Sequence, residues 1–148
     1  MSAFRDFLRQ AETREATKIS ESVDSESGIG FVVVKTLAIS TQVHIWHLLA
    51  KIGQKHTALG SFYDELNIKV DELAEKFIAT GGVLPDFSYN FSNVYSDVDI
   101  VIAIRAYRDE ITVSIDYIKD ISDKMSILDG LTDLMASIDN FIYQFNLT

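Results

Sequence analysis

The three histidines of this chain and three nearby carboxylates are its strongest candidates for metal ligands. The histidines fall within 13 positions, and the carboxylates follow within the next 19. Imidazole and carboxylate groups are ligands that suit iron and zinc. The segment therefore predicts a divalent metal site. Its candidate ligands are His44, His47, His56, Asp64, Asp71 and Glu75.

The spacing of these residues places them on helix faces. His44 and His47 are three residues apart, and Asp71 and Glu75 are four apart. Both separations put two side chains on one face of a helix. Two consecutive helices can each offer a pair of ligands. The Glu-x-x-His repeat of di-iron sites inside four-helix bundles is absent from the sequence. The alternative is ordinary: packed histidines beside a solvated acidic helix face.

The overall composition excludes several classes of function. There is no cysteine, which excludes disulfides, thiolate zinc sites, iron–sulfur clusters and cysteine nucleophiles. The net charge is -9, from 22 acidic and 13 basic residues, and an acidic chain repels nucleic acid. Residues 1–18 carry four basic and three acidic side chains, a net +1, which is little for phosphate neutralisation. DNA binding is not expected.

Neither a secretory signal nor a membrane span is expected from the sequence. Residues 1–20 lack the apolar core of a signal peptide. No uninterrupted apolar run approaches the roughly 18 residues that cross a bilayer. We therefore expect a soluble cytoplasmic protein with no membrane contact.

The chain divides into a tail, residues 1–30, and a domain, residues 31–148. In the tail, apolar side chains recur at helical spacing before a linker-like stretch rich in Ser, acid and Gly. The apolar set is Phe4, Phe7, Leu8 and Ala11. The tail is either mobile or a docking peptide for a partner or sister subunit.

The domain begins with two expected helices. Residues 31–52 form the first, with a wide apolar face that ends near Gly53. Residues 55–80 form the second, which Gly81 and Gly82 stop. Its core stripe steps by three and four residues: Leu59, Phe62, Leu66, Val70, Leu73 and Phe77.

Two further helices follow a long connection. Residues 83–96 hold the only proline and four aromatic residues, so we expect a long loop that packs its own aromatics. Residues 97–128 fit either a strand or a helix, and the length without Gly or Pro favours a helix. A turn is expected at Asp129-Gly130, before a last helix over 131–145. The predicted fold is all-α: a ferritin-like four-helix bundle with a long crossover between helices 2 and 3.

Several of these motifs resemble the Dps family, the mini-ferritins that protect DNA in starved cells. His44 and His56 match the family's two histidines with their spacing of eleven intervening residues. Asp71 and Glu75 match its D-x-x-x-E pair, and Gly81-Gly82 closes the helix as in the family. The last helix, LDGLTDLMASIDNFIYQF, is similar too, and the resemblance covers about residues 35–147.

The resemblance implies an iron site shared between subunits. The histidines of one subunit would meet the acids of its two-fold mate, giving a dimer or a hollow cage that oxidises ferrous iron and stores it. His44, His56, Asp71 and Glu75 would be the ligands, with His47 and Asp64 as second choices. Gly60 stands where the family has a further aspartate, which leaves such a ferroxidase site one carboxylate short.

A smaller set of Dps-like proteins from tailed phages matches more closely. Its pattern is His-Leu followed by K-H-x-A-L-G-x-F-Y-D, found here at His47-Leu48 and at residues 55–64, with Gly60 inside the pattern. The protein would then act in the host cytoplasm or the virion. Two functions stay open: an iron-binding ferritin-like protein, or a metal-free structural or interaction module of a phage that keeps the bundle.

Overall fold

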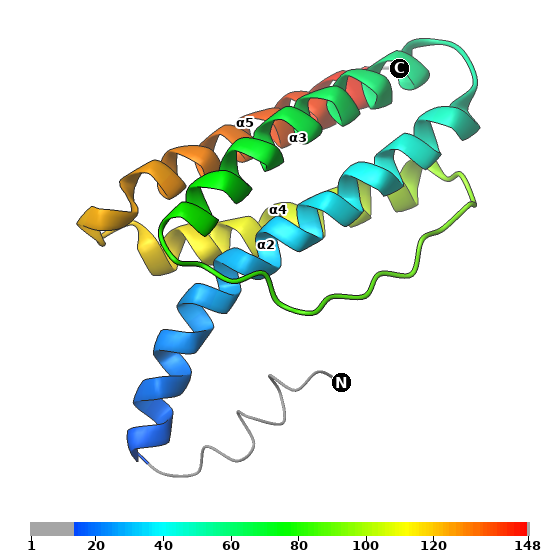
Figure 1. The fold of residues 1–148 in the computed structure, drawn as a ribbon. Coiled ribbons are helices and arrows are strands. Elements are labelled where there is room, and N and C mark those ends of the chain that lie inside the picture. Colours follow the sequence, from blue (N-terminus) through cyan, green and yellow to red (C-terminus); the bar gives the residue numbers. More distant parts are fainter. Residues whose placement is uncertain (1–13, 148) are drawn as a thin grey trace.

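Four α-helices form the protein in our computed structural model, which describes the backbone of residues 14–147 and the side chains of residues 28–147. The helices are α2 (Arg14–Ala50), α3 (Gln54–Ala79), α4 (Asp97–Ile118) and α5 (Met125–Asn146), and a short 3-10 helix, η1 (Ser122–Lys124), precedes the last. No strand occurs in the described part of the chain. The all-helical class is confirmed, and the arrangement is compatible with a four-helix bundle (Figure 1).

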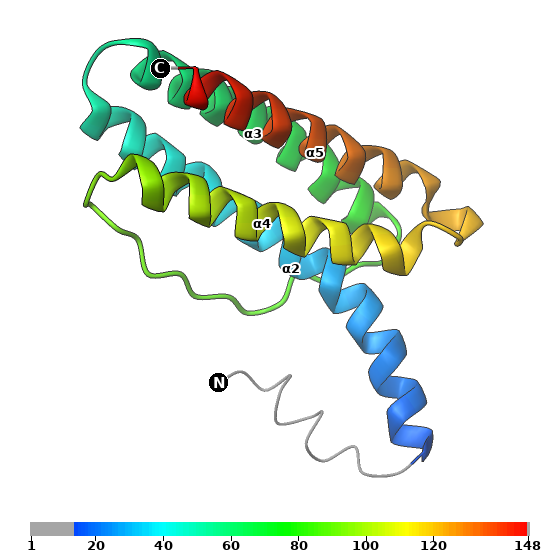
Figure 2. The same cartoon turned by 180° about the vertical axis from the view of Figure 1, so that it is seen from behind.

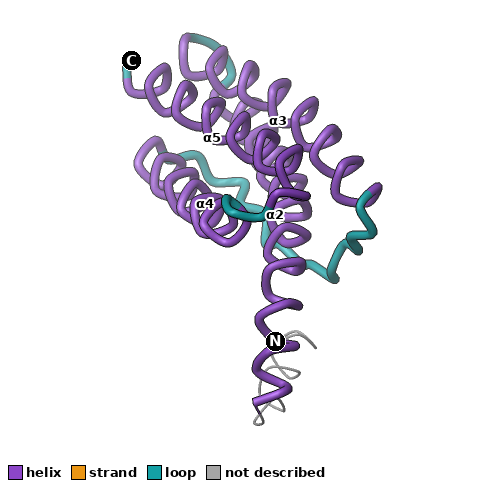
Figure 3. Tube along the Cα trace, turned by 90° about the vertical axis from the view of Figure 1, so that its left-hand side faces the viewer, coloured by secondary structure: helices purple, strands orange, loops and turns teal. Residues whose placement is uncertain are grey.

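In cross-section the four helices lie at the corners of a square. α2 contacts α3 and α4, and α5 contacts the same two helices from the opposite corner. Seen from behind and from the side, the pairs α2/α4 and α3/α5 form two layers (Figures 2 and 3). This arrangement leaves one outer face formed by α2 and α3 together, which carries all the candidate ligands.

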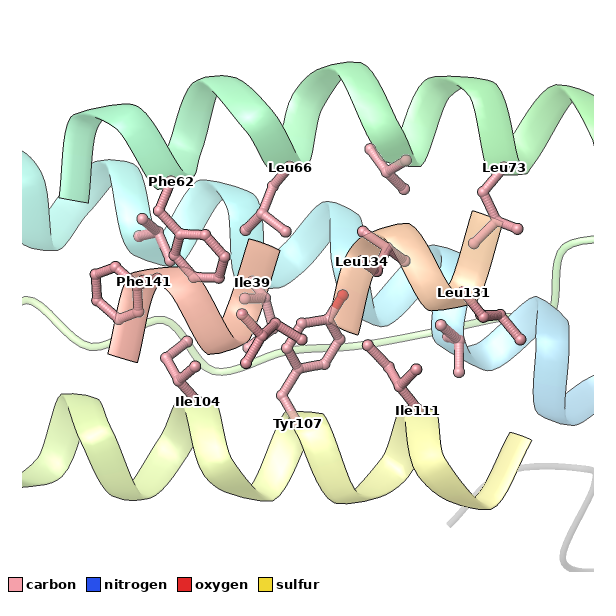
Figure 4. Close-up of a cluster of buried hydrophobic side chains, with 14 of the residues drawn as sticks. Ile39, Phe62, Leu66, Leu73, Ile104, Tyr107, Ile111, Leu131, Leu134 and Phe141 are labelled. Carbon is pink, nitrogen blue, oxygen red and sulfur yellow. The ribbon is translucent and has the colours of Figure 1, made fainter. Parts of the chain in front are cut away.

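The core is built from the apolar stripes of all four helices. The six α3 positions with helical spacing are all buried, as the sequence predicts. Their side chains meet Ile104, Tyr107 and Ile111 of α4 and the inward face of α5 (Figure 4). The buried Tyr107 hydroxyl is hydrogen-bonded to Thr36 Oγ1, which in turn donates to the Val32 carbonyl at 2.6 Å. No buried side-chain polar atom in the described part lacks a partner.

The α4–α5 turn lies ten residues earlier than the sequence predicts. α4 ends at Ile118, and the chain turns over residues 119–124. The expected turn at Asp129-Gly130 is wrong, because both residues lie inside α5. Gly130 instead permits close packing of α5 on α3: a Cβ there would lie 3.0 Å from Leu73 Cδ1.

The first helix starts earlier than expected. α2 includes residues 19–30, whose composition predicts a linker. No proline interrupts this stretch, and Ser, Asp and Gly each cost a helix only about 1 kcal/mol or less. Figure 1 shows the N-terminal part of α2 extending beyond the bundle. The expected amphipathic helix near Phe4 and Phe7 lies mainly outside the described residues.

One part of α2 has the length of a membrane span. Gly28–Ala50 is long enough, and its mean hydropathy over 18 residues high enough, to cross a bilayer. Polar residues interrupt its apolar runs, so the sequence shows no uninterrupted apolar span there. Yet 56% of that window is buried inside the bundle. A core helix of a bundle passes the same test of length and composition.

The segment from 80 to 96 follows the outside of α2. Gly81 adopts a φ of 88°, a left-handed conformation that favours glycine and ends α3 as predicted. The segment then runs along α2 to the far end of the bundle, where α4 begins (Figure 1). Gln42 fastens it, with Nε2 donating to the Ser92 carbonyl and Oε1 accepting from the Ser92 amide, both at 2.8 Å.

Candidate metal-binding face

The three histidines form a row of rings between α2 and α3. His47 stacks on His56 with ring centroids 3.8 Å apart, while His44 lies 6.2 Å from His47 on its other side. His44 in turn stacks on Tyr63 at 4.2 Å. All four side chains are half-buried. His47 therefore lies between the two histidines that the sequence favours as ligands.

His47 and His56 hold each other through reciprocal hydrogen bonds. Nδ1 of His47 donates to the His56 carbonyl at 2.7 Å, and Nδ1 of His56 donates to the His47 carbonyl at 2.8 Å. A carbonyl oxygen can only accept, so each Nδ1 carries the proton. In the neutral rings each Nε2 then keeps a free lone pair. Metal-binding histidines commonly use their second ring nitrogen in this way, so both rings have a tautomer that fits a metal.

Gly60 makes room for the His47 ring. An ideal Cβ at this position would lie 2.8 Å from Cε1 and 3.0 Å from Nδ1 of His47, closer than real contacts allow. Gly60 follows His56 by four residues and therefore shares its face of α3. The glycine that seemed to leave a site one carboxylate short is the place where an imidazole packs instead.

The acidic candidates lie farther along the same helix. Asp64, Asp71 and Glu75 are exposed and follow one stripe of α3. At 1.5 Å per residue, Asp71 lies about 22 Å from His56 along the helix axis. Histidines and acids of one chain are thus not brought together. No group of three or more His, Asp or Glu side chains able to hold a metal occurs within residues 28–147.

The bundle interior offers no alternative metal site. The buried polar side chains among the described residues are hydroxyls and one amide: Thr36, Ser40, Gln42, Tyr107, Ser114 and Ser137. Di-iron sites inside four-helix bundles need inward-facing carboxylates and histidines. Among the described residues, the core therefore holds none of the ligand types that an internal di-iron site requires.

The outer face of α2 is uncharged over a long stretch. No charged residue occurs between Lys35 and Lys51. Leu37 is 46% exposed and Leu48 is 61% exposed, and Ile52 in the following turn reaches 85%. Thr41 and Ile45 continue the stripe between them at helical spacing. Contiguous exposed apolar patches are typical of interaction surfaces.

A groove on the other side of α3 is distinct from the histidines. It has a volume of about 680 Å³ and runs between the start of α3 and the end of α5. Phe62 and Phe141 stack beneath it at 4.4 Å. Its rim holds amides, hydroxyls and the single carboxylate of Glu65. This set contains no imidazole, so the groove is not a second metal site.

Comparisons with protein-family models, curated proteins and solved structures give no match for this chain.

The sequence does not predict the roles of two residues on this face. Tyr63 stacks on His44, yet an aromatic residue next to a core stripe normally predicts packing alone. The Dps resemblance ranks His47 only as a second-choice ligand, although its ring lies in the middle of the row. The available signal was Gly60: glycine inside a strong helix is unfavourable and points to a close approach by another group.

Proposed function

We propose that the protein is a metal-binding homodimer that takes ferrous iron as its cargo, with each site shared between two subunits. His44 and His56 of one subunit would supply imidazoles, and Asp71 and Glu75 of the other would supply carboxylates. Imidazole and carboxylate together suit iron. His47, which stacks on His56, and Asp64 would be the second choices as ligands.

The observation that carries this proposal is the common centre of symmetry of the two helices. On α2, Thr41 and Leu48 are symmetric about residues 44 and 45, and Leu37 extends the stripe toward the start of the helix, while Ile52 belongs to the turn after α2. On α3, His56 and Asp71 are symmetric about residues 63 and 64. The His44–Tyr63 stack at 4.2 Å sets both centres at the same height in the bundle.

A two-fold axis at that height would pass through the symmetry centres of both helices. It would bury the apolar stripe of α2 against its own copy and bring His56 opposite Asp71 of the second subunit. An isologous interface requires this kind of self-complementarity. Burial of the exposed leucines supplies the driving force, at about 25 cal/mol per Å².

The arrangement of the bundle supports the same reading. The segment 80–96 spans the bundle between α3 and α4, and we interpret it as the long crossover of a ferritin-like fold. The free Nε2 lone pairs of His47 and His56 are the donors that such a site needs. Oxidation of the bound iron, with dioxygen or peroxide as the oxidant, is the further activity that the Dps resemblance implies.

The second candidate is a metal-free interaction module with the same dimer face. The observation in its favour is that the His47–His56 pair also has a purely structural use. The reciprocal hydrogen bonds join the end of α2 to the start of α3. Such a clasp would stabilise the helix turn with no metal at all.

Anaerobic titration with ferrous iron separates the two candidates. We expect saturable binding that His56→Ala and Glu75→Ala each weaken by about tenfold or more. Asp133→Ala is the control, because this exposed acid lies on α5, whose main contacts are with α3 and α4 rather than with α2. Far-UV circular dichroism confirms that each variant is folded. Absence of binding by the wild-type dimer would leave the interaction module.

A further inference from the structure

The outward side of α4 carries a second stripe that no part of the described chain covers. Its apolar members are well exposed: Val98 at 68%, Ile102 at 60%, Val113 at 55% and Tyr117 at 52%. With Arg105 and Asp109 between them, the steps are four, three, four, four and four residues. This spacing puts all six side chains along one side of the helix.

The stripe lies opposite the buried side of α4. The core positions Ile100, Ile104, Tyr107 and Ile111 face inward, and Figure 2 shows the other side of the helix on the outside of the bundle. A shallow hollow lined by Val98, Val101 and Ile102 of α4 and by Phe145 of α5 adjoins it. A contiguous apolar stripe on the solvent side of a helix is typical of an interaction surface.

The two charges at its centre, Arg105 and Asp109, are not paired with each other or with another charged side chain in the described part of the chain. The neighbouring Arg108 is bound to Asp139 of α5, with Nε 2.6 Å from Oδ1. Among the ion pairs of the described residues, neither Arg105 nor Asp109 takes part. Both are exposed. Asp109 adds to the negative charge around Arg108, but within residues 28–147 neither Arg105 nor Asp109 makes a direct ion pair in the middle of the apolar stripe.

We infer that α4 pairs antiparallel with α4 of a second copy, through an interface distinct from the α2–α3 face. In an antiparallel pair centred on residue 107, Arg105 of one copy lies opposite Asp109 of the other, and the reverse contact forms as well. In this register Val113 lies one residue, about 1.5 Å along the axis, from the position opposite Ile102, and Tyr117 lies equally close to the position opposite Val98. The stripe is thus complementary to itself in charge and in apolar contact, as an isologous interface must be.

This interface is small and acts together with others. Two helices that meet along one stripe bury less than a standard interface of about 1,600 Å². The contact alone should form only at high protein concentration. If the α2–α3 face also pairs, each chain has two different isologous faces, which link dimers into a closed assembly such as a tetramer.

Charge exchange across the interface provides the sharpest test. Arg105→Asp and Asp109→Arg should each shift sedimentation velocity profiles to smaller species, because each creates two like-charge contacts. The double variant restores two opposite-charge contacts and should recover the wild-type assembly. Asp129→Arg, an exposed reversal on α5, is the control and should change nothing.

Cysteine cross-linking gives a second readout that does not depend on affinity. The chain has no cysteine, so Ala106→Cys introduces a single thiol next to the expected axis. We expect a disulfide-linked dimer under mild oxidation from this variant and none from Ala136→Cys on α5. If no α4 disulfide forms and all charge variants sediment like the wild type, the α4 pairing is wrong. That result would leave the proposed metal-binding dimer untouched, since its face lies on α2 and α3.

Discussion

Replacing Gly60 by alanine should destabilise the protein, although this change stabilises most helices. An alanine Cβ at this position would lie 2.8 Å from Cε1 and 3.0 Å from Nδ1 of His47. The ring must therefore rotate away from α3. Rotation breaks its hydrogen bond to the His56 carbonyl, worth about 1 kcal/mol. It also breaks the stack on His56, worth about 0.5–1.5 kcal/mol.

The gain in helix propensity only partly offsets this loss. Alanine is favoured over glycine inside a helix by about 0.5–1 kcal/mol. The net expectation is a loss of about 1 kcal/mol in the free energy of unfolding. Gly28→Ala is the matched control, because Gly28 is also inside a helix and its nearest neighbour, Ser114 Oγ, would lie 3.9 Å from the new Cβ. That variant should gain about 0.5–1 kcal/mol.

Urea denaturation followed by circular dichroism measures both variants against the wild type. The two substitutions should shift the midpoint in opposite directions at an unchanged slope. A Gly60→Ala protein as stable as Gly28→Ala would refute the reasoning, because it would mean that the His47 ring has no fixed place over Gly60.

Three further predictions concern the bundle itself. Phe62→Ala should cost about 3–5 kcal/mol because this ring is fully buried, whereas Ile68→Ala, at an exposed position of the same helix, should stay within about 0.5 kcal/mol by urea denaturation. Ser96→Ala should cost about 1 kcal/mol in the same assay, because the Ser96 hydroxyl caps α4 by accepting from the Asp99 amide at 3.3 Å. Burial raises the pKa of Tyr107 above its ordinary value of about 10. The unfolded chain loses this proton first, so stability should be constant below about pH 10 and fall above it. Tyr107→Phe should reduce that alkaline loss, and an unchanged profile would show that this phenol is not responsible.

Helical periodicity predicts most of the fold. The α3 stripe from Leu59 to Phe77 is buried as expected, because six apolar residues at steps of three and four leave no other buried face. The length of the uninterrupted segment after residue 97 correctly favours a helix over a strand. Tyr89 and Phe91 pack together in the connecting loop, with ring centroids 4.9 Å apart, as predicted for its aromatics.

The positions of turns and linkers are harder to predict. Gly130 suggested a turn, but in the bundle it permits close contact with Leu73, and a sequence does not state which role a glycine has. The Ser- and acid-rich residues before Ile29 suggested a linker, while the structure continues α2 through them. Local propensities amount to a few tenths of a kcal/mol per residue, so neighbouring turns of helix readily override them.

The sequence indicates which helices carry the candidate ligands, but it does not predict how their side chains pack. Spacing assigned the candidate ligands to two consecutive helices, and the structure places them on α2 and α3. It could not show that His47 packs over Gly60, because that contact joins α2 to α3 in space. Helix geometry also separates His56 from Asp71 by about 22 Å, which is why the proposed ligand set requires a second subunit.

Mixing subunits tests the central claim most directly. A His44→Ala/His56→Ala protein keeps only the acids, and an Asp71→Ala/Glu75→Ala protein keeps only the histidines. Each alone should bind no ferrous iron. After refolding as an equal mixture, half of the dimers contain one intact site, so binding should return to about one quarter of the wild-type number of sites. No recovery in a mixture shown to contain heterodimers would contradict a site shared between subunits.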